Sequence, residues 1–92
     1  MAEKEQKAIR DKCEEISALL IKKNISYGNS AFKPINIFGN LTAEQGLYCR
    51  INDKLSRISN NLTYESEGMA DAIQDCVGYM ILLLILMEQN NI

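Results

Sequence analysis

The sequence of 92 residues contains no histidine and no tryptophan, and it has a single proline. Without histidine, no imidazole base is present to activate a serine or cysteine nucleophile, and the commonest zinc ligand is missing. Any bound metal ion would have oxygen ligands, which favours Mg²⁺ or Mn²⁺. The missing histidine therefore excludes several large classes of enzyme mechanism.

Cysteines are few, and Cys13, Cys49 and Cys76 lack Cys-x-x-Cys spacing. The first ten residues are too rich in charge for a secretory signal peptide. We therefore expect reduced thiols that fill the core of a cytoplasmic protein.

The sequence also lacks a long run of basic residues and an apolar run long enough to span a membrane. The formal net charge is −2 and no basic run is present, which argues against binding to DNA or RNA polymers. The apolar stretch from Cys76 to Met87 has twelve residues. A membrane-spanning helix needs about 20, so we expect no membrane partner. Length indicates one domain over residues 1–92.

Apolar residues at helical spacing predict three helices, near residues 3–23, 42–60 and 66–89, and therefore an all-α fold. Thr42 and Gln45 form a capping-box pattern, Asn60-Asn61 is expected to end the second helix, and Ser66 is a candidate cap for the third. The predicted buried faces comprise Ile9, Cys13, Ile16 and Leu20 in the first helix, and Leu47, Ile51, Leu55, Ile58 and Leu62 in the second.

Residues 25–41 break the helical pattern. They contain turn-forming residues around Pro34 but also the aromatic residues Tyr27, Phe32 and Phe38. A flexible linker carries few aromatic residues, so we expect a long ordered loop that serves for binding or as a lid.

The third helix is apolar on every side from Met80 to Met87. Such a helix is normally buried on every side, and three helices alone do not achieve this. The sequence therefore predicts a homo-oligomer, a dimer or tetramer, in which three-helix protomers form a helical bundle around the third helix.

Glu67, Asp71, Asp75 and Tyr79 recur every four residues and share one helix face. In one interpretation Glu67, Asp71 and Asp75 hold Mg²⁺ or orient basic residues; in the other they are a solvated surface. Tyr79 favours the first interpretation, because it lies one turn further into the apolar region, where its hydroxyl needs a partner.

Two further groups are candidate ligand contacts. Arg50, Lys54 and Arg57 form a basic stripe with Asp53 nearby, which either grips a phosphate or makes ion pairs. The loop offers aromatic rings to stack on a base and polar groups to bond its edge or a phosphate, unless it is only a turn whose rings plug the core. These loop candidates are Tyr27, Asn29, Ser30 and Phe32.

Three segments together resemble a known family: residues 23–32, 50–58 and 71–79. Their order and spacing are similar to those of the small phage and bacterial proteins called nucleotide modification associated domain 1. The resemblance covers about residues 22–86, and its more specific parts are Arg-x-x-Asp-Lys-x-x-Arg and Asp-x-x-x-Asp-x-x-x-Tyr. It implies phage biology, nucleotide handling and, for a phage-encoded protein, the cytoplasm of the host cell.

The layout is more distantly similar to the MazG-like all-α nucleoside triphosphate pyrophosphohydrolases, which bind Mg²⁺ through Glu-Glu-x-x-Glu and Glu-x-x-Asp motifs. Here Glu14-Glu15 is followed by Ala18 where that family has the third carboxylate, and the later acidic residues are four apart. The carboxylate set is therefore incomplete for hydrolysis, and the sequence assigns no catalytic residue.

The leading hypothesis is a phage-type protein that binds a nucleotide or a nucleotide-derived signal at subunit interfaces and sequesters it to counter host defence. The basic stripe would contact phosphate, Tyr27 and Phe32 would close over the base or sugar, and the acidic residues would orient the basic ones. The alternative is a Mg²⁺-dependent pyrophosphohydrolase. A third hypothesis is a protein-interaction module that docks through the third helix.

Overall fold

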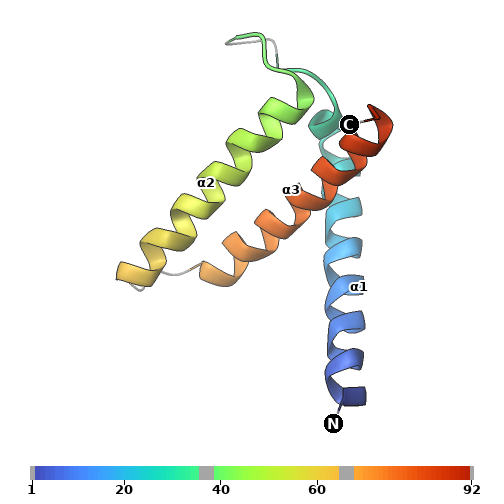
Figure 1. Cartoon of the computed structure of the whole chain (residues 1–92), viewed down its shortest axis with the longest axis vertical. Coiled ribbons are helices and arrows are strands. Elements are labelled where there is room, and N and C mark those ends of the chain that lie inside the picture. Colours follow the sequence, from blue (N-terminus) through green and yellow to red (C-terminus); the bar gives the residue numbers. More distant parts are fainter. Residues whose placement is uncertain (1, 36–38, 65–67, 92) are drawn as a thin grey trace.

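The chain forms three α-helices and one short 3₁₀ helix over the residues that the computed structural model describes, 2–35, 39–64 and 68–91 (Figure 1). The α-helices are α1 (Ala2–Ser26), α2 (Ala43–Tyr64) and α3 (Met69–Gln89), and the 3₁₀ helix is η1 (Ser30–Phe32). The predicted all-α fold is therefore confirmed for this part of the chain.

α2 and α3 form an antiparallel pair, and the core lies where α2 begins and α3 ends (Figure 1). Residues near the start of α2 pack there against Leu82 and Leu86 of α3. Leu47 is almost completely buried, with 1% of its surface exposed. Ala31 and Phe32 of η1 also pack on this cluster, so the segment after α1 is fixed against the helical pair.

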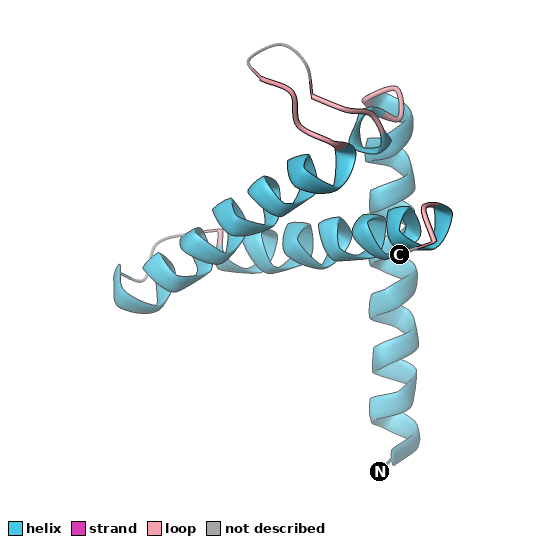
Figure 2. Ribbon diagram, turned by 45° about the horizontal axis from the view of Figure 1, so that its top comes forward, coloured by secondary structure: helices cyan, strands magenta, loops and turns pink. Residues whose placement is uncertain are grey.

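α1 crosses α3 at a steep angle, and its N-terminal part projects beyond the helical pair (Figure 2). The crossing is close at Gly78, because a Cβ atom there would lie 3.3 Å from Cδ1 of Leu20. No α1 residue is buried in the chain by itself. The predicted buried face of α1 is thus only partly covered: Ile16 and Leu20 are half-buried, whereas Cys13 is exposed and Ile9 is 63% exposed.

The predicted capping box at the start of α2 is confirmed. The Thr42 backbone N–H donates to Oε1 of Gln45 at 2.9 Å, and the Gln45 N–H donates to Oγ1 of Thr42 at 3.1 Å. α1 ends at Ser26, and the left-handed conformation at Gly28 (φ 62°) and Asn29 (φ 64°) turns the chain into η1.

Two predicted helix ends were wrong. α2 does not end at Asn60-Asn61 but continues to Tyr64, because Asn61 is buried and packing overrides its weak helix propensity. α3 begins at Met69 after a left-handed Gly68 (φ 90°), so its N-cap is not Ser66. Ser66 and Glu67 lie outside the described residues.

The predicted loop between the first two helices contains η1 and an isolated antiparallel bridge between Ile35 and Leu41. The two backbone hydrogen bonds of this bridge measure 2.9 and 3.0 Å. Ile35 packs on Gly46 of α2, where an added Cβ would meet its Cδ1 at 2.7 Å. The loop is thus anchored to α2 through Ile35. Phe38 lies outside the described residues.

Several residues predicted for the core are exposed in the chain by itself. Leu55 is 49% exposed, and of the three cysteines only Cys76 is buried. α3 is buried on one face only, and its other face is an exposed stripe of apolar side chains that are 37–61% exposed. This α3 stripe consists of Ile73, Val77, Met80, Ile81, Leu84 and Ile85.

By length and composition, α3 is apolar enough to cross a membrane. An 18-residue window of it has a mean hydropathy of 1.7, and 28% of that window is buried inside the chain. The count of twelve apolar residues thus understated the apolar length of this helix.

Candidate functional site

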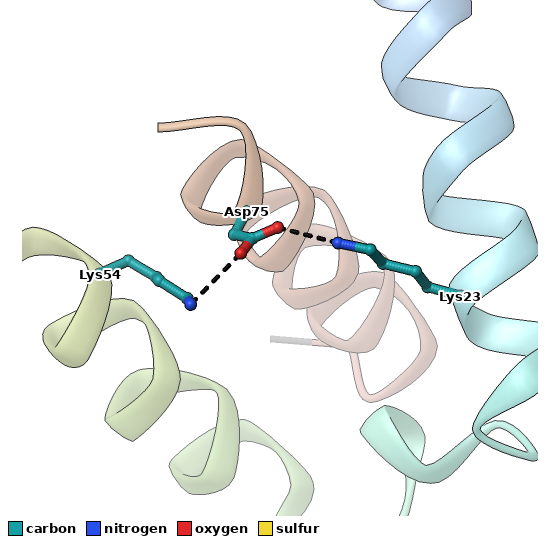
Figure 3. A network of polar contacts seen from close by, with 3 residues as sticks. All are labelled: Lys23, Lys54 and Asp75. Atoms are coloured by element: carbon teal, nitrogen blue, oxygen red, sulfur yellow. Dashed lines mark hydrogen bonds and ion pairs between the residues drawn. The ribbon is translucent and has the colours of Figure 1, made fainter. Parts of the chain in front are cut away.

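Asp75 connects all three helices through its carboxylate (Figure 3). Nζ of Lys23, in the last turn of α1, donates to Oδ1 of Asp75 at 3.0 Å. Nζ of Lys54, in the middle of α2, lies 3.2 Å from the other oxygen, Oδ2. A single acidic side chain on α3 therefore holds one lysine from each of the other two helices.

The surroundings of Asp75 change how it and Lys23 titrate. Partial burial alone raises the pKa of Asp75, but the hydrogen bonds and charges of Lys23 and Lys54 together outweigh burial and hold this pKa below its usual value of 3.8. The hydrogen bond to Asp75 raises the pKa of Lys23 above its usual 10.5, although burial opposes it. Asp75 and Lys23 therefore both carry their charges at neutral pH.

A cavity of about 80 Å³ opens beside this ion-pair network, between α1, α3 and the start of η1. Its walls combine aliphatic side chains, two tyrosines, two amides and charged groups. The guanidinium carbon of Arg50 lies 5.9 Å from the ring centre of Tyr79, which is cation–π range. The lining residues that bear polar groups are Lys23, Asn24, Tyr27, Ser30, Arg50, Gln74, Asp75 and Tyr79.

The charges at this site do not balance. Among the described side chains that line the cavity, Lys23 and Arg50 are basic and Asp75 is the one acidic residue, which leaves a surplus of one positive charge, and Lys54 adds a further basic group beside the lining. The surplus is positive in a chain whose net charge is −2. Since a cavity with surplus positive charge attracts anions, the site is suited electrostatically to an anionic group.

The size of the cavity limits what it can enclose. A water molecule occupies about 30 Å³ in the liquid, so 80 Å³ accommodates a few waters or a group the size of a phosphate. Sites that enclose a whole drug-sized ligand are about 300 Å³ or larger. A larger ligand would therefore place its anionic group inside and extend outward along Tyr27, which is 68% exposed.

The structure brings five of the predicted ligand-binding residues together around one cavity. Tyr27 comes from the turn after α1, Ser30 from the start of η1, Arg50 from α2, and Asp75 and Tyr79 from α3. Lys54, also predicted, joins them through its ion pair with Asp75. The cavity lies within one chain, whereas the sequence predicted pockets between subunits.

Five other predicted residues lie outside the cavity lining. Phe32 packs on the core instead of closing over a ligand. Asn29 is exposed at the start of η1, and Asp53, Arg57 and Asp71 are exposed on α2 and α3. The Arg57 guanidinium lies beside Gly68, because a Cβ added there would be 3.4 Å from it. Arg57 of α2 thus lies near the start of α3, whereas Asp75 lies further along α3.

The predicted Mg²⁺ site is only partly within the described residues. Glu67 lies outside them, and Asp71 is exposed one turn before Asp75. Over the described ranges, no three cysteine, aspartate or glutamate side chains gather in a way that could hold a metal ion. Both oxygens of Asp75 already contact lysines.

The sequence pattern missed Lys23, Asn24 and Gln74. Lys23 and Asn24 lie in the segment 23–32 that carries the family resemblance, but neither was predicted to contact a ligand. A usable signal was present, since Lys23 precedes Tyr27 by four residues, and the Tyr27 N–H, just after the end of α1, donates to the Lys23 carbonyl at 2.9 Å. No signal in the sequence placed that face against Asp75, because this contact joins residues 52 positions apart.

No protein family, curated protein or solved structure matches this chain.

Proposed function

We propose that the protein binds a nucleotide or a nucleotide-derived small molecule, with an anionic phosphate in the cavity beside Asp75. The observation that carries this proposal is that Lys23 and Lys54, from two helices, pair with the Asp75 carboxylate beside a cavity that Arg50 also lines. Asp75 orients the lysines, and the surplus positive charge is available to a ligand. Arg50 offers the planar fork that suits phosphate.

The rest of the ligand would lie along the open side of the cavity. Tyr27 and Tyr79 provide aromatic faces for a base or sugar, and stacking of this kind tolerates any base. Asn24, Gln74 and Ser30 provide donors and acceptors for a base edge or a sugar hydroxyl. These groups fit a compact nucleotide and not a nucleic-acid polymer, since no basic run extends from the cavity.

Sequestration fits the site better than hydrolysis. Asp75 is occupied by two lysines, and metal-dependent hydrolysis needs several carboxylates that hold Mg²⁺ and activate a water. A protein that only binds its ligand needs no such set. Together with the phage-like sequence segments, this supports a cytoplasmic protein that withholds a nucleotide signal from host defence.

Isothermal titration against a panel of linear and cyclic nucleotides tests the proposal. We expect at least one to bind, and Lys23→Gln to weaken that binding about tenfold, because one charge-assisted contact is lost. Lys22→Gln is the matched control, since Lys22 is the exposed neighbour on α1 and lies outside the cavity lining. Absence of binding to any nucleotide, or equal losses in both variants, contradicts the proposal.

The fate of the ligand separates binding from catalysis. After incubation with Mg²⁺ or Mn²⁺, the bound nucleotide should be recovered intact, without release of pyrophosphate. Turnover that disappears in Asp75→Asn would instead establish the pyrophosphohydrolase alternative.

A further inference from the structure

The α3 stripe is apolar and lies opposite the face of α3 that packs against α2. Among residues 72–87, Asp75 is the only charged side chain, and it points toward α1 and α2. The six stripe residues expose on the order of 300 Å² of apolar surface, if a whole aliphatic side chain offers about 120 Å². A continuous patch of this size matches the largest patches on ordinary monomers, which often serve as interaction surfaces.

The first half of α1 is a second uncovered feature, here called the α1 arm (residues 2–15). Every arm residue is exposed. Its only ion pairs among the described residues are local ones, Lys7 with Asp11 and Lys12 with Glu15. Most helix stability in proteins comes from packing of an apolar face, so a partner surface would stabilise the arm.

The arm passes over the α3 stripe side of the molecule. The C-terminal end of α1 is held on the α2 side, where Lys23 pairs with Asp75 and Tyr27 lines the cavity with Arg50 of α2. The N-terminal end therefore extends away from α2, on the far side of α3 (Figure 2). The arm thus overhangs the space that a helix packed on the α3 stripe would occupy.

The residue spacing in α1 matches the width of one added helix. Leu20 contacts the α3 backbone at Gly78, and Cys13 lies on the same face of α1 two turns earlier. Seven residues of helix measure about 10 Å, and neighbouring helix axes are about 8–10 Å apart. Ile9 continues this face by one more turn. A helix beside α3 would therefore lie under Cys13 and Ile9.

We propose that a second copy of this chain covers the α3 stripe with its own α3, and that each α1 arm crosses onto the α3 of the partner copy. Each arm then buries Ile9 and Cys13 against the neighbouring subunit. The result is a closed two-fold dimer in which both uncovered apolar surfaces of each chain are buried.

A second copy fits this surface better than another partner. The stripe carries no charge, so two copies meet without repulsion or unpaired ions. A stable dimer buries roughly 800 Å² on each chain, which exceeds the stripe alone. The arm supplies the additional area, and the α3 of a second copy is a helix of the length and apolar character that fits under it at the required spacing.

Sedimentation of the full chain tests the dimer, and arm variants test the crossing. We expect a species of twice the 10.4 kDa chain mass. Ile9→Asp should weaken association about tenfold or more, because it places a charge in the interface. Ala18→Asp adds the same charge to the opposite, exposed face of α1 and should leave association unchanged.

A disulfide then tests which chain the arm contacts. In a chain with Cys49→Ser, single cysteines replace Val77, Ile81 or Ile85 in turn, and we expect Cys13 to form an inter-chain disulfide with at least one of them. Chains carrying two different tags will identify the inter-chain product. A monomer at high concentration, or a monomer that binds phosphatidylcholine vesicles through α3, overturns the proposal. A dimer without this disulfide, or one that Ile9→Asp leaves intact, overturns the arm crossing.

Discussion

Asp75 is the residue on which the geometry of the site depends. It is the only described side chain that forms ion pairs with two other helices. Its own side chain is 24% exposed and that of Lys54 is 18% exposed, so water screens this contact less than a surface pair. Removing the Asp75 charge leaves two ammonium groups close together without a counter-charge.

Asp75→Asn should therefore lower the free energy of unfolding by about 1–2 kcal/mol near neutral pH. The pKa of Asp75 is lowered on folding, so its contribution is lost as pH falls below 3.8 through the folded pKa. The pKa of Lys23 is raised, so its contribution is lost as pH rises above 10.5. The difference between wild type and variant should thus be constant between about pH 5 and 9.

Urea unfolding over this pH range measures the effect. Asp71→Asn is the control, because it removes the same charge one turn earlier from an exposed position. It should change stability by less than about 0.5 kcal/mol. Equal effects from the two variants would show that the ion pairs of Asp75 add nothing to stability.

For individual side chains, the sequence predicted Asp75, Tyr79, Arg50 and Lys54 as site residues, and the structure places all four together. The four-residue spacing was informative because it fixes which side chains share a helix face. It carries no information about which cation on another helix reaches that face. Lys23 was therefore missed, and Arg57, which has the same periodicity, lies too far along α2.

At the level of the helices, Gly78 is the residue that allows α1 to pack closely on α3. Its missing side chain allows Leu20 to approach the α3 backbone, and both residues line the cavity. The position of α1, and with it that of Lys23, depends on this close crossing.

Gly78→Leu should separate the two helices and lower the free energy of unfolding by about 1–3 kcal/mol through overpacking. It should also abolish nucleotide binding, because Lys23 moves away from the cavity. Ala70→Leu is a suitable control, since Ala70 is exposed on the same helix. Thermal unfolding and titration calorimetry measure the two effects, and a stable Gly78→Leu variant that binds normally would contradict this role for the crossing.

Helix positions were predictable, but not all of their ends. The capping box placed the start of α2 correctly, because the signal consists of two local side-chain hydrogen bonds. The Asn60-Asn61 stop failed because Asn61 is buried, and burial depends on residues distant in sequence. Periodicity also identified the apolar face of α1 without indicating that Ile9 has no cover within its own chain.

For the whole molecule, the proposed dimer would link stability to association. A chain that buries its α3 stripe only as a dimer folds and associates together. Its midpoint of thermal unfolding should therefore rise by several degrees over a hundredfold increase in protein concentration. Calorimetry or circular dichroism at several concentrations measures this. A midpoint independent of concentration would indicate a self-sufficient monomer.

The proposed assembly is the feature least accessible from the sequence. An apolar run predicts burial but does not name the surface that covers it, so the expected oligomer remained a dimer or a tetramer. The direction of the α1 arm relative to the α3 stripe is the observation on which our proposal of a dimer rests.

The cavity also has an optical consequence. The chain contains no tryptophan and four tyrosines, and two of those four, Tyr27 and Tyr79, line the cavity. Its near-ultraviolet emission therefore comes from tyrosine alone, without a brighter indole to mask it. A base that stacks on either ring would quench a large share of that emission, so the unlabelled protein carries its own fluorescent reporter of occupancy.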